Sequence, residues 1–363
     1  MEGHVQFAYT DEQLQFRDIA AKFMADKSPS VEVRRLMETE RGFDDAVWNS
    51  LSNELGVTAL IIPEVYGGQG FGFVELGIVM EEAGRALLCA PYFSTCVMGA
   101  GAIISAGTEA QKQALLPEIA AGTRFVSLAL TDSAAPVRVS ADGTLTGEKT
   151  LVVDGCLADT IVVAAEQDGA TRLFVVDAAA AGLERRHLAT IDPTRKLAAL
   201  SFDATPAEPM AGDAGALSDV LDGAAVALAN EMMGGAQRLL DSAVEYSQIR
   251  MQFGRAIGSF QAIKHKCADL LLDVELAKSA AYQAAWARSE DEPDAPALAS
   301  LAKAAASDTY MQMAAACVQL HGGIGFTWDH DTHLWYKRAK SSEVLLGDAN
   351  HHRELMLQRW SET

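Results

Sequence analysis

Two arginines and a glutamine lie close together in a short segment, where their side chains could bind an anionic group. Arg250, Gln252 and Arg255 fall within IRMQFGRAIG, and Gly254 and Gly258 indicate a turn there. Long amphipathic helical patterns lie on both sides of this turn. Guanidinium groups and helix-end amides in such a turn suit a phosphate or another anion. The alternative is a surface turn that joins two helices and binds nothing.

Three other patterns of reactive residues give weaker signals. His330 and His333 are spaced for one helix face, but histidine and aspartate near a helix start are more often caps or surface groups, so we expect no metal site. The glycine-rich stretch between Pro63 and Gly72 lacks the Lys-Ser/Thr pair of a phosphate-binding loop. No nucleophile elbow supports hydrolysis by a Ser-His-Asp triad.

The chain is long and strongly acidic. It has 363 residues, of which 49% are hydrophobic and 21% charged, as is typical of a globular protein with two or three domains. Its net charge of −20 argues against nucleic acids and anionic membranes as general partners. No apolar run approaches the roughly 20 residues that cross a bilayer. An anionic cofactor would therefore have to be held by local cations.

Cysteine usage and the first residues indicate the compartment. The five cysteines have no Cys-x-x-Cys pairing, which favours buried thiols in a reduced compartment over disulfides or a zinc site. The opening stretch MEGHVQFAYTDEQLQ lacks the basic and apolar regions of a signal peptide. We therefore expect a cytoplasmic protein.

The hydrophobic pattern divides the chain into three segments. Residues 1–122 contain amphipathic helical runs, and residues 123–215 contain short β-branched runs separated by turn signals such as Asp-Gly. Residues 216–363 contain four or five long amphipathic runs, which favour a bundle of antiparallel helices. The predicted fold class is α+β, with an N-terminal all-α domain, a middle β domain and a C-terminal helical bundle.

Local signals predict where several of these elements begin and end. Thr10 is expected to cap the first helix, with Gln13 at the capping-box position. Gly56 and Gly122 are expected to close the helices in DDAVWNSLSNELG and TEAQKQALLPEIAAG. The segment ATPAEPMAGDAG, with two prolines, is expected to link the β domain to the bundle.

Two blocks of sequence, in a fixed order, carry a resemblance to a known family. The first block is RMQFG followed by IGSFQ, from Arg250 to Gln261, and the second is QLHGGIGFT, from Gln319 to Thr327. They resemble the RxxFG…(I/L)xxxQ and QxxGGxGF signatures of the acyl-CoA dehydrogenase family. The resemblance covers nearly the whole chain and implies helical, barrel-like β and four-helix-bundle domains in that order.

The family resemblance implies a reaction and its partners. Such enzymes bind FAD and introduce an α,β double bond into an acyl-CoA thioester, with a carboxylate taking the α-proton and the flavin the β-hydride. Each FAD spans a subunit interface, so the resemblance implies a homo- or hetero-oligomer. An electron-transfer flavoprotein is the implied electron acceptor.

The resemblance also implies which residues contact the cofactor. They are Arg250, Gln252, Phe253, Phe260, Gln319, Gly322, Gly323 and Thr131. Arg250 is implied to meet the pyrophosphate, because a guanidinium fork matches phosphate oxygens. Gly322 and Gly323 are implied to approach from a neighbouring subunit, since glycine permits close backbone contact. A helix C-cap is an alternative role for this glycine pair.

The chain departs from the family pattern at the flavin ring and at the catalytic base. The run Leu151 to Asp154 replaces a Trp-Ile-Thr-Asn-like run, so Val153 stands where a threonine would donate to flavin N5. Leu346 stands where most members carry the catalytic glutamate, and Ala224 where another branch carries it. Neither position can accept a proton.

Two carboxylates remain as candidate bases. Glu231 lies on the helix face of Ala224 and Leu228, where an apolar setting could raise its pKa toward that of a useful base. The alternative is a structural glutamate bonded to another helix or subunit. Asp348 falls at a family threonine position associated with the cofactor. The neighbouring run from His351 to Arg353 is interpreted as a contact between helices or at the cofactor edge.

The resemblance offers one explanation for both the altered flavin-ring residues and the missing catalytic base. Some bacterial acyl-CoA dehydrogenases that shorten steroid side chains are α2β2 assemblies, in which one chain supplies the base and the other complementary flavin contacts. The sequence resembles the second kind of chain. The alternatives are a self-sufficient homo-oligomer that uses Glu231 or Asp348, and a scaffold of this shape without flavin. The acyl group itself is not predicted.

Overall fold

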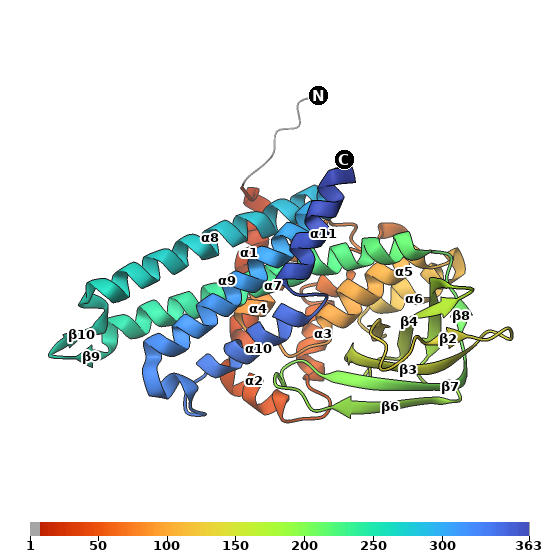
Figure 1. Ribbon diagram of the computed structural model, residues 1–363, viewed down its shortest axis with the longest axis horizontal. Coiled ribbons are helices and arrows are strands. Elements are labelled where there is room, and N and C mark those ends of the chain that lie inside the picture. Colours follow the sequence, from red (N-terminus) through yellow and green to blue (C-terminus); the bar gives the residue numbers. More distant parts are fainter. Residues whose placement is uncertain (1–7, 363) are drawn as a thin grey trace. The chain divides into compact units, whose positions relative to one another are not determined.

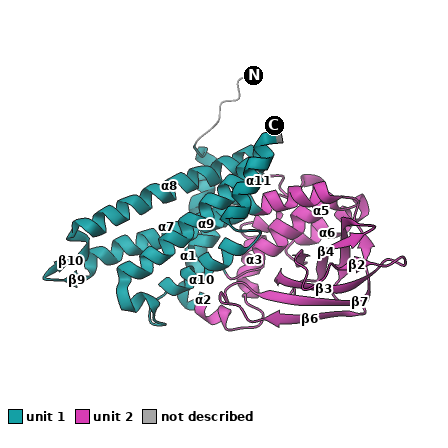
Figure 2. Ribbon diagram, in the orientation of Figure 1, with its two compact units in different colours: residues 1–33, 72–88, 225–363 teal, residues 34–71, 89–224 magenta. Residues whose placement is uncertain are grey.

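The computed structural model describes residues 8–362, which form two compact units (Figures 1 and 2). The helical unit comprises the chain up to residue 33, residues 72–88 and the chain from residue 225 onward. The sheet unit comprises residues 34–71 and 89–224. The expectation about a signal peptide rests partly on residues 1–7, which lie outside the described residues.

The helical unit consists of long helices packed around α9. Its helices are α1 (Asp11–Lys27), α4 (Phe73–Arg85), the later part of α7 (Ala214–Ile249), α8 (Gln261–Ser289), α9 (Ala295–His321), α10 (Thr332–Val344) and α11 (Ala349–Glu362) (Figure 1). Helices α8, α10 and α11 each pack directly on α9. Helix α1 begins with the predicted capping box, in which the Gln13 N–H donates to Thr10 Oγ1 at 3.2 Å and the Thr10 N–H to Gln13 Oε1 at 3.0 Å.

The sheet unit joins short helices to one mixed sheet. The helices and helical turns are α3 (Asp45–Asn53), η1 (Val57–Ala59), η2 (Glu64–Tyr66), η3 (Phe93–Gly99), α5 (Ala100–Ala106) and α6 (Glu109–Ala120), and α2 (Ser30–Met37) crosses the boundary between the units. The strands are β1 (Val126–Ala129), β2 (Arg138–Val139), β3 (Thr144–Val153), β4 (Thr160–Gln167), β5 (Ala170–Asp177), β6 (Leu183–Leu188), β7 (Leu197–Pro206) and β8 (Glu208–Pro209). Their order is β6-β7-β3-β2-β4-β5-β8, with β1 parallel to β4.

The predicted order of helices, strands and helices is confirmed, but two local predictions were wrong and strand β6 lacks the predicted β-branched pattern. Strand β6 was missed because its sequence, LERRHL, is mostly exposed and does not alternate, so pairing with β7 decides its structure. The predicted link ATPAEPMAGDAG instead continues β7 and adds β8, which pairs with β5. Helix α3 ends at Asn53, and Gly56, with φ of 69°, precedes η1 rather than closing the helix.

The boundaries at residues 122 and 215 stay a prediction. Helices α1 and α4 of the first predicted segment belong to the helical unit, whereas α3, α5 and α6 belong to the sheet unit. All five cysteines are free in the described chain, and three of them are buried. Within residues 8–362, no helix has the length and apolar content needed to cross a membrane, and no group of three or more potential ligand side chains could hold a metal ion.

Helices α4 and α7 cross in backbone contact inside the helical unit. A Cβ placed on Gly84 would lie 1.9 Å from the Glu231 carbonyl oxygen, and one on Gly234 would lie 1.7 Å from the Glu81 carbonyl oxygen. Because no side chain fits between the two backbones, these glycines set the distance between the helices. The crossing thus fixes the backbone positions from which the side chains of Glu81, Glu82 and Glu231 extend.

Replacing Gly84 with alanine is therefore expected to destabilise the protein by about 2–3 kcal/mol, because the added methyl group pushes the two helices apart. Gly101→Ala on α5 is the matched control, since its Cβ would meet only Val220 Cγ1 at 3.9 Å. That exchange should be neutral or slightly stabilising. Urea unfolding of both variants measures the difference, and equal midpoints would show that the crossing can relax.

Candidate functional site

The segment between α7 and α8 is a small β-hairpin rather than the simple turn that the sequence predicts. Strand β9 (Met251–Gln252) pairs antiparallel with β10 (Arg255–Ala256), and a short turn, η4 (Ile257–Ser259), leads into α8. Phe253 and Gly254 form the tip with φ of 51° and 78°. A left-handed phenylalanine was not foreseeable, because β-pairing on both sides imposes it.

The hairpin presents the predicted cofactor residues to solvent in the single chain. Arg250 and Gln252 are exposed, and 92% of the Phe253 side chain is accessible. Within residues 8–362, the Arg250 guanidinium makes no hydrogen bond or ion pair. Phe260 is half-buried, and the Arg255 guanidinium lies 4.0 Å from its ring centroid. The tip thus offers one uncommitted cation beside aromatic surface.

The predicted second cofactor block ends α9 at the same end of the helical unit. Gly322 is the C-cap with φ of 67°, so the alternative role proposed for the glycine pair is present. No atom of the described chain lies within 4 Å of a Cβ built on Gly322 or Gly323, and Gln319 is exposed. Tyr246, near the end of α7, stacks on His321 with ring centroids 4.3 Å apart, which brings the two blocks together.

Glu231 lies far from these blocks, in the middle of α7, and is held in an ion pair. Its Oε1 is 2.5 Å from Arg338 Nη1 of α10, and the two side chains are only 6% and 4% exposed. The structural alternative considered for Glu231, a bond to another helix, is thus present. To act as a base it would have to give up this guanidinium contact, so its role as the base stays a prediction.

Asp348 caps the last helix, α11. The backbone N–H of His351 donates to Asp348 Oδ1 at 2.9 Å. This hydrogen bond holds the pKa of the Asp348 carboxyl below its usual value, which makes it a weaker base. Its assignment as the base stays a prediction, but the local structure gives it a complete role as an N-cap.

The loop between α10 and α11 carries Leu346 at the position where the family places its base. Leu346 and Gly347 have φ of 62° and 102°. The Lys303 side chain extends from α9 to the loop, where its Nζ donates to Gly347 O at 2.9 Å and, at the end of α10, to Glu343 O at 3.1 Å. The His352 Nε2–H donates to Leu346 O at 3.0 Å. Two buried side chains therefore brace this loop through its main-chain oxygens.

Burial makes both of these side chains, Lys303 and His352, harder to protonate. Burial lowers the pKa of Lys303 to about 8 and that of His352 to about 4, and the nearby Lys303 charge adds to the effect on the histidine. Within the described chain, His352 Nδ1 has no hydrogen-bond partner. At neutral pH the imidazole is therefore neutral, with its proton on Nε2.

Acidification should weaken the fold through His352. The unfolded state, with a histidine pKa near 6.5, binds more protons than the folded state between about pH 6.5 and 4, so stability is lost as the pH falls through that window. The expected loss from pH 7 to pH 5 is about 2 kcal/mol. His352→Gln should abolish this part, whereas the exposed neighbour exchange His351→Gln should retain it. Urea unfolding at both pH values measures the difference.

Thr131, predicted to contact the cofactor, and Val153, at the predicted flavin-ring position, lie in the sheet unit. Thr131 follows β1 and is exposed, and its carbonyl oxygen accepts from the Thr150 N–H at 2.8 Å. Val153 is 3% exposed at the end of β3, after a register shift between Lys149 and Val152. A buried valine offers no hydrogen-bond donor there.

The structure brings the two predicted phosphate-end blocks together through the contact of Tyr246 with His321. Glu231 in the middle of α7, Asp348 before α11 and Thr131 in the sheet unit are not part of that contact. Sequence reasoning missed Arg338 and Lys303. Lys303 left a usable signal, because it is the lone charge in the alanine-rich run ASLAKAAAS. Arg338 left none, since its stretch YKRAK carries three positive charges and resembles an exposed segment.

Comparison with known proteins settles the family. The model described as "Acyl-CoA dehydrogenase, N-terminal domain" matches residues 10–123, and that described as "Acyl-CoA dehydrogenase, C-terminal domain" matches residues 215–360. The chain belongs to the acyl-CoA dehydrogenase family. The acyl-CoA dehydrogenase IpdE2 of Mycobacterium tuberculosis (strain ATCC 25618 / H37Rv) is 38% identical over 336 residues, 93% of each chain. FadE27 of the same strain, also named an acyl-CoA dehydrogenase, is 32% identical over 87% of this chain and 88% of its own.

Solved acyl-CoA dehydrogenase structures share the whole fold. A chain of the ChsE4–ChsE5 complex from Mycobacterium tuberculosis matches with a TM-score of 0.92 and 28% identity, over 99% of this chain and 100% of that chain. A chain from a variant of the Tcur3481–Tcur3483 steroid ACAD matches with a TM-score of 0.89 and 30% identity, over 97% and 98%. Each name joins two designations, and the first is that of a complex.

Proposed function

We propose that this chain is the base-deficient, flavin-binding subunit of a heteromeric acyl-CoA dehydrogenase. One observation carries the proposal: the family's base position holds Leu346, on a loop that Lys303 and His352 keep in place. The loop is therefore held in place, but it carries a leucine at the base position, and its one carboxylate, Asp348, accepts a hydrogen bond from the His351 N–H. The proton acceptor then has to come from a second acyl-CoA dehydrogenase chain.

The end of the helical unit fits the phosphate end of FAD. Arg250 has an uncommitted guanidinium, and Gly323 leaves open space where a nucleotide can approach the backbone. Gln252, Phe253 and Phe260 add polar and aromatic surface around them. When bound, the flavin would accept the hydride from the β-carbon of the acyl thioester, while this chain's residues bind and orient the cofactor.

Exposed apolar residues at the same end support assembly with another chain. Phe253, Phe326 and Trp328 are 92%, 79% and 61% exposed. Large apolar side chains gathered on one surface are typical of a protein–protein interface. The relatives named as two-chain complexes favour a hetero-oligomer over a homo-oligomer. We further infer a cytoplasmic location from the free cysteines, and an electron-transfer flavoprotein as acceptor from the family resemblance.

Expression with and without a partner gene tests the proposal. The chain alone should be colourless or insoluble, and co-expression with a neighbouring acyl-CoA dehydrogenase gene should give a yellow complex that acyl-CoA bleaches. Native mass spectrometry then reports subunits and cofactor together. A yellow homo-oligomer that acyl-CoA bleaches without any partner would contradict the proposal.

That contrary outcome defines the second candidate, a self-sufficient homo-oligomer. The burial of Glu231 favours it, because a buried carboxylate that leaves its ion pair with Arg338 can serve as a base. Glu231→Gln and Asp348→Asn then distinguish the two carboxylates by which exchange abolishes bleaching. A chain that stays colourless and inert with every partner is a scaffold without flavin.

Arg250→Ala tests the cofactor site in any yellow form. Removing the guanidinium takes away a charge-assisted contact to phosphate, so FAD affinity is expected to fall about ten-fold or more. The measurement is flavin retained per chain after gel filtration. Lys22→Ala, which removes an exposed cation on α1, is the control and should retain flavin. Equal retention in both variants would remove Arg250 from the site.

A further inference from the structure

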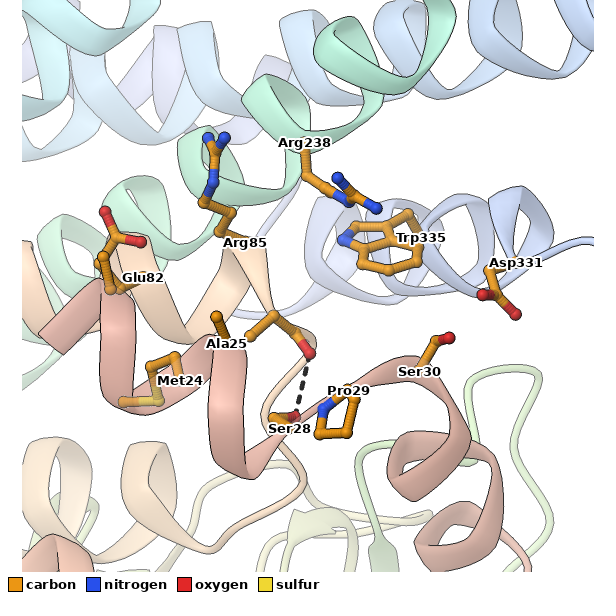
Figure 3. Close-up of a pocket in the computed structure, with 12 residues that line it drawn as sticks. Met24, Ala25, Ser28, Pro29, Ser30, Glu82, Arg85, Arg238, Asp331 and Trp335 are labelled. Carbon is orange, nitrogen blue, oxygen red and sulfur yellow. Dashed lines mark hydrogen bonds between the residues drawn. The ribbon is translucent and has the colours of Figure 1, made fainter. Parts of the chain in front are cut away.

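A cavity of about 500 Å³ opens within the helical unit, and none of the residues predicted to bind flavin or act as a base lines it. Its walls come from α1 and the link to α2, from α4, from α7 and from α10 (Figure 3). The polar groups that line it include Glu82, Arg85, Arg238, Asp331 and Trp335. Cavities of roughly 300–1,000 Å³ are the size of small-molecule sites.

Trp335 brings a buried hydrogen-bond donor to this cavity. The residue is only 6% exposed, and its indole Nε1 has no hydrogen-bond partner among residues 8–362. The nitrogen lies on the edge of the ring that faces Arg85 and Glu82 rather than Asp331 (Figure 3). A buried N–H without an acceptor is costly, so an acceptor from outside the chain would relieve that cost.

Arg238 adds an uncommitted cation beside this donor. Its guanidinium carbon lies 5.9 Å from the centroid of the Trp335 ring, and in the described chain it makes no hydrogen bond or ion pair. The other arginine of the cavity, Arg85, is already paired with Asp241 at 2.5 Å. The Nε1–H has almost no accessible surface, so a ligand oxygen reaches it only once the side chains around it shift; the N–H and the exposed Arg238 guanidinium together then suit a single oxyanion.

Glu82 limits how much negative charge the cavity accepts. It is 7% exposed and has no hydrogen bond or ion pair from its carboxyl group within the described residues. Burial, reinforced by the neighbouring Glu81, raises the pKa of Glu82 to about 7. With Asp331 also lining the cavity, a dianion such as phosphate meets repulsion. A monoanion meets less repulsion, particularly when Glu82 is protonated.

The remaining wall is apolar. Ala21, Met24, Ala25 and Ala86 line it, and the Ser28 hydroxyl is used in a 3.0 Å hydrogen bond to the Ala86 carbonyl oxygen (Figure 3). This bond fixes the link after α1 against the end of α4. A ligand with an apolar body beside its charged group would contact this wall.

We propose that the cavity binds a small organic monocarboxylate, whose carboxylate accepts hydrogen bonds from the Trp335 Nε1–H and the Arg238 guanidinium while its apolar body packs on α1. The site is independent of the proposed flavin function, because none of its residues belongs to that site. The helix crossing at Gly84 positions one wall, and Trp335 lies one turn before the ion-paired Arg338 on α10.

Isothermal titration with benzoate, followed by a crystal soak, tests the proposal on the full chain purified with whatever flavin and partner it holds. Benzoate should bind, with its carboxylate at the indole nitrogen. Trp335→Phe, which keeps the ring contacts and removes the donor, should weaken binding about ten-fold. Arg238→Gln should weaken it at least as much. Glu82→Gln should strengthen it at pH 8, where the native carboxyl is charged.

The control is Trp360→Phe, the same exchange on α11, outside the cavity, which should leave benzoate binding unchanged. The proposal is overturned if benzoate fails to bind the native chain, if Trp335→Phe binds as the native chain does, or if the soak shows only an ordered water at Nε1. Inorganic phosphate should bind more weakly than benzoate. Tighter binding of phosphate at the same residues would refute the monocarboxylate assignment.

Discussion

Replacing Arg338 with methionine is expected to cost about 3–5 kcal/mol of folding free energy. The exchange leaves the Glu231 carboxylate buried, at 5% exposure, without the guanidinium that lies 2.5 Å away in the native chain. A buried charge without its partner is far more costly than the pair itself is stabilising. Urea unfolding measures the loss.

Two further variants separate this mechanism from simple loss of packing. Adding Glu231→Gln to Arg338→Met removes the stranded charge and should recover most of the stability. Arg353→Met removes the exposed pair with Asp308, whose side chains are 49% and 50% exposed, and should change stability little. If the double variant is no more stable than Arg338→Met alone, the ion pair is not the cause.

Replacing Lys303 with methionine is expected to cost about 3–4 kcal/mol and to loosen the loop between α10 and α11. Methionine fills a similar volume but leaves the Gly347 and Glu343 carbonyl oxygens and the Ser307 hydroxyl, at 2.9, 3.1 and 3.0 Å, without their donor. Part of the loss is offset because the native amine is buried at the cost seen in its lowered pKa.

Unfolding and amide hydrogen exchange of residues 345–348 measure the two effects. Lys340→Met is the matched control, because that amine pairs with Glu343 on the surface and is 50% exposed. It should be nearly neutral and leave exchange in the loop unchanged. Equal exchange rates in the two variants would show that Lys303 does not hold the loop.

Periodicity and capping signals were enough for the order of the elements, since α1 starts at its capping box and the long amphipathic runs form helices. They failed where pairing with a neighbour outweighs local pattern. Strand β6 and the hairpin at Gln252 and Arg255 exist because another strand lies beside them. No property of either segment alone predicts that neighbour.

The candidate site shows the same contrast between features that local sequence predicts and features that tertiary contacts decide. The two cofactor blocks could be located because their motifs are local, and the structure brings them to one end of the helical unit. The partner of Glu231 could not be located, because Arg338 is 107 residues away and nothing in its own stretch marks it as buried. Local motifs therefore predicted which segments could form a site, whereas tertiary contacts decide which carboxylates are held in ion pairs.

The braces on the loop between α10 and α11 all end on main-chain oxygens, those of Glu343, Leu346 and Gly347. These hydrogen bonds do not involve the side chain at position 346. After a gene duplication, one copy could therefore lose an acidic residue there without losing any of them. The fold and the catalytic residue can then be inherited separately. A subunit without the acidic residue can persist as long as the other subunit retains its own.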